Sequence, residues 1–209
     1  MTARLFDYWR SSASYRVRIA LGLLGIPFES VTVNLLEAEQ RSPENLARNP
    51  QGLVPTLEID GRRMTQSLSI VEYLSETHGD AFMPGDPAGR QRVRALAHVV
   101  AMDIHPVCNL SVARHAVEMS GGRIDMADWM RHFIPPGLSA FETMLDAPET
   151  GRFCHGDQVT IADICLVPQL YNARRWGIDV TSLSRIREIA DRLEALPAFA
   201  AAHPDNFKP

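Results

Sequence analysis

The sequence predicts an α/β N-terminal half followed by an all-α C-terminal half. In residues 1–78, short alternating runs and helical spacings follow the order strand–helix–strand, then strand–strand–helix. Gly79–Gly89 is the densest cluster of glycine and proline in the chain, and we find only helical patterns beyond it. We therefore predict one domain at residues 1–80, a linker at 81–89 and a helical domain at 90–209.

The first strand and helix surround the stretch that organises the chain. Arg4–Tyr8 alternates apolar and polar residues, as a short strand does, and a helical spacing begins soon after Ser12. Serines between a strand and a helix are favoured as N-caps. The N-terminus of a helix also stabilises an anion placed there. Ser11 and Ser12 are therefore either caps alone or part of an anion site.

The other elements of the first half follow from turn and cap residues. Gly25-Ile26-Pro27 ends the first helix, and Asp60-Gly61 marks a hairpin. Either Ser67 or Ser69 is a good cap for the next helix, and Ser69 with Glu72 has capping-box spacing. The predicted segments are a strand at Phe28–Val33, a short helix at Pro43–Arg48, strands at Val54–Ile59 and Arg63–Thr65, and a helix from Ser67.

In the second half we predict a long helix at Arg90–Glu118 and another at Met126–Leu145, which breaks at Pro135-Pro136-Gly137. Thr160 and Asp163 open a helix that runs to about Trp176, and we expect both to be structural cap residues. The final helix spans Arg185–Ala195, and Pro197 ends it.

Composition excludes several classes of protein. The chain has 209 residues, of which 45% are hydrophobic and 22% charged, which are ordinary globular values. A net charge of −4 argues against nucleic acid or an anionic membrane as the main partner. We see no signal-peptide core and no run of about 18 apolar residues. Cys108, Cys154 and Cys165 form no metal or Cys-x-x-Cys pattern, so we expect buried inert thiols, no metal site and a cytoplasmic location.

One run, Ser-Ser-Ala-Ser-Tyr-Arg-Val-Arg-Ile-Ala-Leu, begins at Ser11. This run is similar to the signature of the zeta class of glutathione transferases, the maleylacetoacetate and maleylpyruvate isomerases. The resemblance covers essentially the whole chain and implies a thioredoxin-like N-terminal domain followed by an all-helical domain. The other matching stretches are Asn49–Leu57, Gln66–Leu74, Asp103–Pro106, Asn109–Val112 and Asn172–Trp176.

Two positions bear on the branch of the class. Ala13 stands where the zeta signature has a cysteine, which puts any catalytic role of a cysteine in doubt. Because maleylpyruvate isomerases also lack this cysteine, Ala13 favours the maleylpyruvate branch. Ser111 leans towards the maleylacetoacetate branch, because many maleylpyruvate isomerases carry an arginine there.

The resemblance implies glutathione as the cofactor and assigns its ligands. Ser11 would hydrogen-bond the glutathione sulfur, with Ser12 and the helix N-terminus beside it. The Val54 backbone would pair with the cysteinyl part, and Pro55 would be cis to aim that backbone outward. Gln66 and Ser67 would bind the γ-glutamyl end, and Gln40 is a further ligand whose register depends on a polar loop. The alternative for Pro55 is an ordinary proline at the start of a strand.

The substrate side would come from the second domain. His98, Met102, His105 and Asn109 have the spacing of one helix face, and Pro106 should bend that helix. The resemblance places Arg10 and Arg175 near the substrate carboxylates, and Arg174 at the surface. Arginine suits that role because its fork binds a carboxylate with two hydrogen bonds. The alternatives are packing histidines and solvated arginines.

The function implied is glutathione-dependent cis–trans isomerisation of a maleyl-type dicarboxylate, foremost maleylacetoacetate to fumarylacetoacetate, in aromatic amino acid catabolism. Maleylpyruvate isomerisation, or transfer of glutathione to small α-halo acids, is the alternative within enzymes. A non-catalytic module of the same fold is the alternative from another class, and it predicts damaged glutathione ligands, which the sequence does not show. The resemblance also implies a homodimer, a small-molecule substrate and no nucleic-acid or membrane partner.

Overall fold

The computed structural model describes residues 2–79 and 81–209, and the chain divides into two compact units. Unit 1 comprises residues 1–81 together with Ala195–Pro209, and unit 2 comprises Phe82–Glu194. The C-terminal segment Ala195–Pro209, which we predicted in the helical domain, therefore belongs with the sheet. The predicted domain end at residue 80 lies outside the described residues. Each unit is described by itself.

Unit 1 is built on a four-stranded sheet with the order β2-β1-β3-β4. Strand β1 runs parallel to β2, pairing Leu5 with Ser30, and antiparallel to β3, pairing Leu5 with Leu57. Leu5 and Leu57 are fully buried because both lie on inner strands. The bounds are β1 Ala3–Asp7, β2 Phe28–Thr32, β3 Thr56–Ile59 and β4 Arg62–Thr65.

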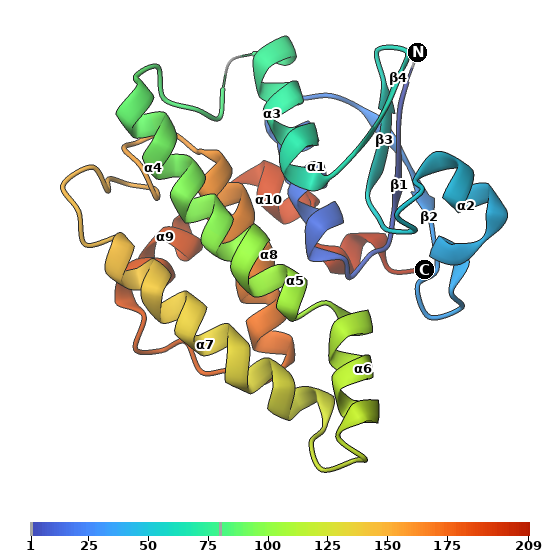
Figure 1. Cartoon of the computed structure of the whole chain (residues 1–209). Coiled ribbons are helices and arrows are strands. Elements are labelled where there is room, and N and C mark those ends of the chain that lie inside the picture. The colour runs from blue at the N-terminus through green and yellow to red at the C-terminus, as the bar shows by residue number, and fades with distance from the viewer. Residues whose placement is uncertain (1, 80) are drawn as a thin grey trace. The chain divides into compact units, whose positions relative to one another are not determined.

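The helices of unit 1 cover both faces of this sheet, with α1 and α3 on one side and α2 on the other (Figure 1). Residues Ser12–Leu21 of α1 are all buried, since α1 also contacts α10 from the C-terminal segment. The bounds are α1 Ser12–Leu23, η1 Glu39–Arg41, α2 Pro43–Arg48, α3 Ser67–His78, α10 Pro197–Ala201 and η3 Pro204–Phe207, where η1 and η3 are 3₁₀ turns. Pro197 begins α10 at its first turn, so our expectation that it only ends a helix was incomplete.

The regular elements of the described part of unit 2 are helices, with α8 at the centre, and an isolated β-bridge joins Thr150 and Gly156 in the loop before α8. Nearly every residue of α8 is buried, and α8 contacts α4, α9 and the π-helix η2. The bounds are α4 Pro87–His98, η2 Val99–Ile104, α5 His105–Val107, α6 Leu110–Met119, α7 Met126–Met144, α8 Ile161–Arg175 and α9 Ser184–Glu194. Because α4 begins at Pro87, the last residues of the predicted linker, up to Gly89, are already helical.

The predicted single helix at Arg90–Glu118 is wrong. A π-helix replaces the α-helical turn at Val99–Ile104, and the His105 N–H bonds to the Val100 carbonyl. Asn109 then has extended backbone angles and caps a new helix, α6. The chain therefore changes its helical period between His98 and Asn109, so the α-helical spacing that predicted one common face does not hold across this segment.

The predicted break at Pro135-Pro136 is also wrong, because α7 is continuous through both prolines. A proline lacks the N–H that would bond to the carbonyl one turn earlier. Here those carbonyls belong to the exposed residues Arg131 and His132, where water can hydrate them. The buried side chains Ile134, Leu138 and Phe141 hold the opposite face of α7 in the core.

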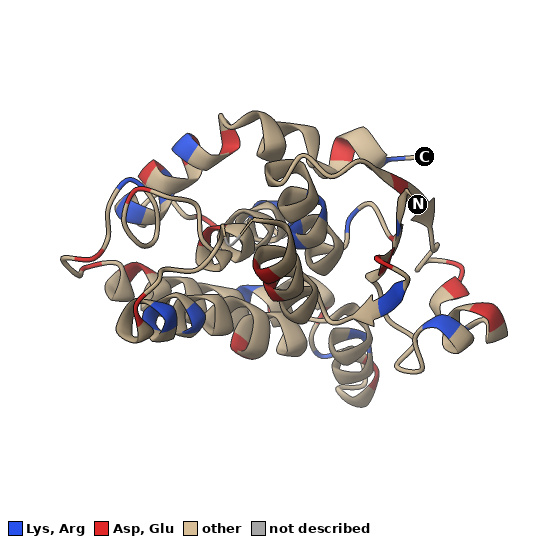
Figure 2. Ribbon diagram, turned by 90° about the horizontal axis from the view of Figure 1, so that it is seen from above, with Lys and Arg blue, Asp and Glu red and all other residues tan. Residues whose placement is uncertain are grey.

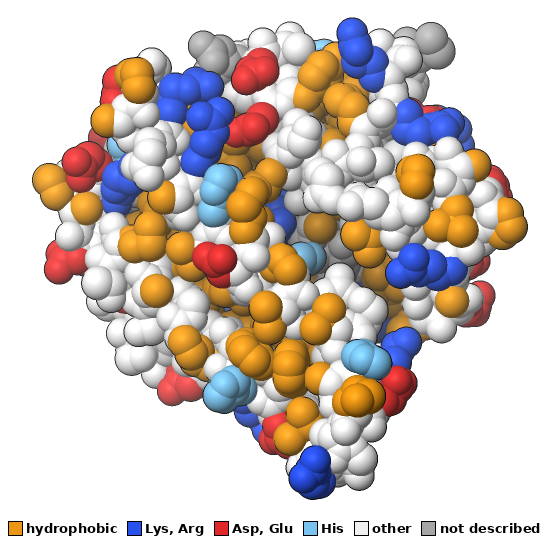
Figure 3. All heavy atoms as spheres, in the orientation of Figure 1, with side chains coloured by type: hydrophobic (Ala, Val, Ile, Leu, Met, Phe, Trp, Pro, Cys, Tyr) orange, Lys and Arg blue, Asp and Glu red, His pale blue; other side chains and the backbone are white. Residues whose placement is uncertain are grey.

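Residues of both charge signs are distributed along the whole ribbon (Figure 2). In the described residues one helical stretch, Pro87–Met119, is long and apolar enough to cross a membrane by length and composition alone, and 28% of its apolar window is buried. One such stretch is weak evidence for a membrane span. Figure 3 shows hydrophobic side chains on the surface of the helices from α4 to α7, and Met102 and Val112 are among the exposed ones.

Candidate active site

The N-terminus of α1 carries the two predicted serines. Ser11 is the N-cap, with extended backbone angles, and its Oγ accepts a hydrogen bond from the Ser14 N–H at 3.2 Å. A hydroxyl that accepts in this way still has its own proton to donate. Ser11 is only half-buried, whereas Ser12 is 8% exposed. The cap and the anion-site interpretations are therefore compatible at Ser11.

A tight turn leads from β1 into this helix end. The Ser11 N–H bonds to the Tyr8 carbonyl at 2.8 Å, so Trp9 and Arg10 are the central residues of a β-turn. The Arg10 guanidinium lies 4.7 Å from the Trp9 ring and donates to the Tyr8 hydroxyl at 3.1 Å. Arg10 is half-buried and holds a positive charge one residue before Ser11.

The junction between β4 and α3 is the second part of the site. Gln66 has φ 69° and ψ 107°, a strained conformation for a residue with a side chain. The next residue, Ser67, opens α3 and is buried, and its Oγ accepts from the Arg16 guanidinium at 3.2 Å. Arg16 lies on α1, so this contact ties the start of α3 to the helix that carries Ser11.

Two further glutamines lie in this region: Gln51, which we did not predict as a site residue, and Gln40, whose predicted role depends on the register of a polar loop. Gln66 Nε2 donates to Gln51 Oε1 at 2.8 Å, which leaves the Gln66 oxygen free to face outward. Gln40 lies in η1, and its Oε1 is buried without a hydrogen-bond partner among the described residues. The sequence signal for Gln51 is its place in the matching stretch Asn49–Leu57, in which only Val54 and Pro55 were assigned a role.

The segment before β3 brings backbone groups to the same region. The Val54–Pro55 peptide bond is cis, as predicted. Gly52 has φ 62°, and a Cβ there would meet the Arg41 guanidinium at 2.8 Å. Arg41 in turn donates to the Gln51 carbonyl at 3.3 Å. Gln40, Gln51, Val54, Gln66 and Ser67 thus belong to one connected part of unit 1.

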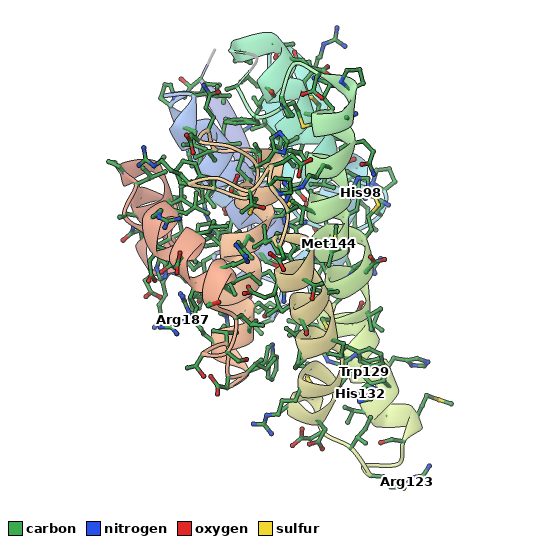
Figure 4. All side chains as sticks on the ribbon, turned by 90° about the vertical axis from the view of Figure 1, so that its left-hand side faces the viewer. His98, Arg123, Trp129, His132, Met144 and Arg187 are labelled. Carbon is green, nitrogen blue, oxygen red and sulfur yellow. The ribbon has the colours of Figure 1, made fainter. Side chains whose placement is uncertain are left out.

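The predicted substrate residues of unit 2 lie on consecutive but different elements: His98 ends α4, Met102 lies in η2, His105 opens α5 and Asn109 caps α6. His105 follows the π-helix and is half-buried, whereas the Asn109 side chain caps α6 and accepts from the Ser111 N–H at 2.9 Å. His98 lies a full π-helix away, at the end of α4 (Figure 4). Figure 4 also labels Trp129 on α7, whose indole N–H donates to the Val107 carbonyl at 2.9 Å and so anchors α5.

Arg174 and Arg175 end α8, and both are exposed. Arg174 pairs with Glu194 at 2.6 Å, as expected for the surface member of the pair. The Arg175 guanidinium lies 5.3 Å from the Trp176 ring. Arg10 belongs to unit 1 and Arg175 to unit 2, so a shared substrate contact stays a prediction.

The three cysteines are buried and form no disulfide. Burial raises the pKa of Cys108 to about 11, and burial, then the nearby Asp163 carboxyl, raise the pKa of Cys154 well above its ordinary value. Neither thiol is therefore a thiolate at neutral pH. Among the described residues no cluster of His, Cys, Asp and Glu has the arrangement of a metal site.

A βαβ–ββα sheet unit with a polar helix end at Ser11 and a cis proline before β3 defines the class of protein. The family model of the glutathione S-transferase N-terminal domain matches residues 5–82. The maleylacetoacetate isomerase of Rhizobium meliloti (strain 1021) is 58% identical over 98% of this chain and 97% of its own. The chain therefore belongs to the maleylacetoacetate isomerase family of glutathione transferases.

Solved structures agree with this assignment. A bacterial zeta-class glutathione transferase, a holo maleylpyruvate isomerase, is 39% identical, covers 96% of both chains and has a TM-score of 0.92. A maleylacetoacetate isomerase from Anaeromyxobacter dehalogenans 2CP-1, with dicarboxyethyl glutathione and citrate bound in its active site, is 45% identical. It covers all of this chain, this chain covers 96% of it, and the TM-score is 0.87. The predicted thioredoxin-like and all-helical fold is confirmed.

Proposed function

We propose that this protein is a glutathione-dependent cis–trans isomerase that converts maleylacetoacetate to fumarylacetoacetate. The observation that carries the proposal is the serine-capped N-terminus of α1, whose first turn contains no acidic residue, in a chain that belongs to the glutathione transferases. The dicarboxyethyl glutathione of the Anaeromyxobacter relative joins a glutathione sulfur to a dicarboxylate, as an isomerase that uses the thiol would require.

The residues of unit 1 fit glutathione. The buried, unpartnered Oε1 of Gln40 offers an acceptor to a ligand. Gln66 and Ser67 present an amide oxygen and a helix N-terminus to the γ-glutamyl ammonium and carboxylate. The Val54 backbone pairs with the cysteinyl part. We assign these four residues and Pro55 to glutathione binding.

Bound glutathione supplies a thiolate that adds reversibly to the double bond, so that the bond can rotate before the thiolate leaves. Ser11 keeps the sulfur ionised by donating its hydroxyl proton in a hydrogen bond, and Ser12 lies beside it. Lowering a thiol pKa of ~8.5 by about two units requires roughly 2.7 kcal/mol. A helix end contributes ~0.3–2 kcal/mol and a hydrogen bond to a charged acceptor ~1.5–3 kcal/mol, so the two suffice.

Arg10 and Arg175 are proposed to bind the carboxylates of the substrate, and His105 to contact it. One end of the diacid must stay in place while the other turns, and bidentate guanidinium contacts provide that restraint. Asn109 contributes at most its amide N–H groups, since its oxygen caps α6.

The direct test is an ultraviolet assay of maleylacetoacetate and of maleylpyruvate, each with and without glutathione. We expect glutathione-dependent isomerisation with the higher kcat/KM for maleylacetoacetate. A higher kcat/KM for maleylpyruvate would transfer the assignment to the second branch, which the likeness to the holo maleylpyruvate isomerase favours. Conjugation of an α-halo acid without isomerisation of either maleyl acid would contradict the proposal.

The arginines give a prediction of their own. Arg10→Ala and Arg175→Ala should each lower kcat/KM for the maleyl diacid by about 30-fold to several thousand-fold, because a desolvated carboxylate loses its partner. Conjugation of a neutral aryl halide should change little, since it needs only the thiolate. Arg174→Ala is the matched control and should leave both activities intact. Equal losses of both activities in the two variants would mean that the arginines are structural.

We also propose a cytoplasmic homodimer. Three cysteines that form no disulfide support a reducing compartment. Met102 and Val112, exposed on unit 2, offer apolar contacts for a second copy. Light scattering after size exclusion measures the mass, and a monomer at micromolar concentration would contradict the dimer.

A further inference from the structure

Arg18 is a charged residue in the core of unit 1. It lies in the middle of α1 and is 1% exposed. Arginine is almost never buried without partners, because desolvating a guanidinium is costly. Its Nη1 donates to Asp7 Oδ2 at 2.7 Å, and Asp7, equally buried at the end of β1, also accepts from Ser30.

An ion pair with Asp7 uses only one arm of the guanidinium. The second arm, Nη2, donates to the Trp9 carbonyl at 2.9 Å, and Nε donates to the Ala202 carbonyl at 3.2 Å. The three acceptors come from three segments: the end of β1, the turn before α1 and the C-terminal segment. A planar fork reaches all three at once, whereas the compact ammonium of lysine does not.

The Trp9 carbonyl belongs to the turn that places Ser11. That turn is closed by the bond from the Ser11 N–H to the Tyr8 carbonyl, with Trp9 and Arg10 in its centre. Rotation of the Trp9–Arg10 peptide would move Arg10 and the start of α1 together. Arg18 holds this peptide from inside the core, and a displacement of about 1 Å at a reacting group can cost about 100-fold in rate.

The C-terminal segment supports the same arrangement from the other side. The Phe207 ring lies 4.4 Å from the Arg18 guanidinium and stacks on Phe28 with ring centroids 6.2 Å apart. Lys208 Nζ lies 5.7 Å from the Trp9 ring. The end of the chain therefore packs against both Arg18 and the residue whose carbonyl Arg18 holds.

We infer that Arg18 is a positioning residue for Ser11: by holding the Trp9 carbonyl, with the C-terminal segment packed against it, Arg18 sets where the Ser11 hydroxyl meets the glutathione sulfur. This inference rests on the proposed function. It assigns to Ala195–Pro209 a role in thiol activation, although that segment lies farthest in sequence from the serines.

The test compares Arg18→Lys with Arg92→Lys. Arg92 is a matched control because its guanidinium also bridges separate segments, bonding to Cys154, Thr150 and Met144, but it lies in unit 2. We would measure the thermal midpoint, glutathione affinity, and the thiol pKa of bound glutathione from thiolate absorbance. Both variants should lose thermal stability, but only Arg18→Lys should raise the thiol pKa, by about one unit, which is an about tenfold lower ratio of thiolate to thiol at a given pH.

The outcomes separate the inference from the proposed function. If the unaltered protein binds glutathione without lowering its thiol pKa, the proposed function fails. If the unaltered protein lowers the thiol pKa of bound glutathione and a folded Arg18→Lys variant lowers it by the same amount, the positioning role is overturned. An equal rise of the thiol pKa in Arg92→Lys would also overturn the positioning role, because the rise would then come from a general loss of thermal stability. Should Arg18→Lys not fold, Phe207→Ala decides: a smaller rise supports the role, and an unchanged pKa overturns it.

Discussion

The N-termini of α1 and α8 both carry a hydroxyl cap, yet they are built differently. At α8, Asp163 accepts from the Thr160 N–H and hydroxyl, each at 2.7 Å, and from the Cys154 N–H at 2.9 Å. Thr160 and Asp163 are buried, so a carboxylate of the chain itself occupies the positive end of the helix. At α1, the half-buried Ser11 makes one cap bond, and the first turn, which is described in full, contains no acidic residue.

The difference shows when a capped helix end is structural and when it can take a ligand. A helix end closed by its own acid contributes to stability alone, while an open end with positive potential is available to an external anion. We therefore expect changes at α8 to affect stability and changes at α1 to affect chemistry.

The largest expected effect is at α8. Asp163→Ala leaves the N–H groups of Thr160 and Cys154 buried without an acceptor, so the free energy of unfolding should fall by about 3–5 kcal/mol. Denaturant unfolding of the variant measures this. A loss below 1 kcal/mol would mean that the α8 end is not closed as described. Thiol activation by any folded fraction should be unchanged.

The second prediction compares two serine N-caps whose cap hydrogen bonds have the same length. Ser42 caps α2 and accepts from the Asn45 N–H at 3.2 Å, the same distance as the cap bond of Ser11. Ser11→Ala and Ser42→Ala should each lower the free energy of unfolding by about 1 kcal/mol. Only Ser11→Ala should lower the kcat/KM of isomerisation, and an equal kinetic loss in both variants would remove the distinction between the two ends.

The smallest effect concerns an exposed acidic cap. Asp86 caps α4, and the hydrogen bond from the Gly89 N–H, at 2.7 Å, holds the pKa of this carboxyl below its ordinary value of 3.8. A lowered pKa gives stability that is present above 3.8 and lost as pH falls through the folded-state pKa. The thermal midpoint of Asp86→Asn should therefore lie below that of the unaltered protein by a constant amount from about pH 5 to 8. At lower pH, where Asp86 becomes protonated, this difference between the two midpoints should shrink. A gap that is independent of pH would contradict this.

Local features of the fold were predictable from sequence, whereas features that depend on distant contacts were not. The pairing of Thr160 with Asp163 depends on neighbouring residues and was predicted from them, whereas the cis Val54–Pro55 bond was predicted from the family resemblance. The continuity of α7 was not predicted, because it depends on core packing and on Gly137, where a Cβ would collide with the Ile104 side chain of the π-helix.

The candidate site shows the same division. Ser11, Ser12, Gln66 and Ser67 could be placed from cap positions and motifs, since each lies at the start of a helix. The contact between Arg18 and Ala202 joins residues far apart in the chain, and no spacing rule connects them. Asn109 was predicted inside one long helix but caps α6, because the chain leaves the α-helical period in the π-helix before it.

The central claim is that the open end of α1 ionises the glutathione thiol through Ser11. The measurement that tests it most directly is a pH titration of thiolate absorbance for glutathione bound to the unaltered protein and to Ser11→Ala. The account predicts a pKa about two units below that of free glutathione, raised by one to two units in the variant, on the order of one hydrogen bond to a charged sulfur. An unchanged midpoint in a variant that still binds glutathione would contradict the claim and point to Ser12.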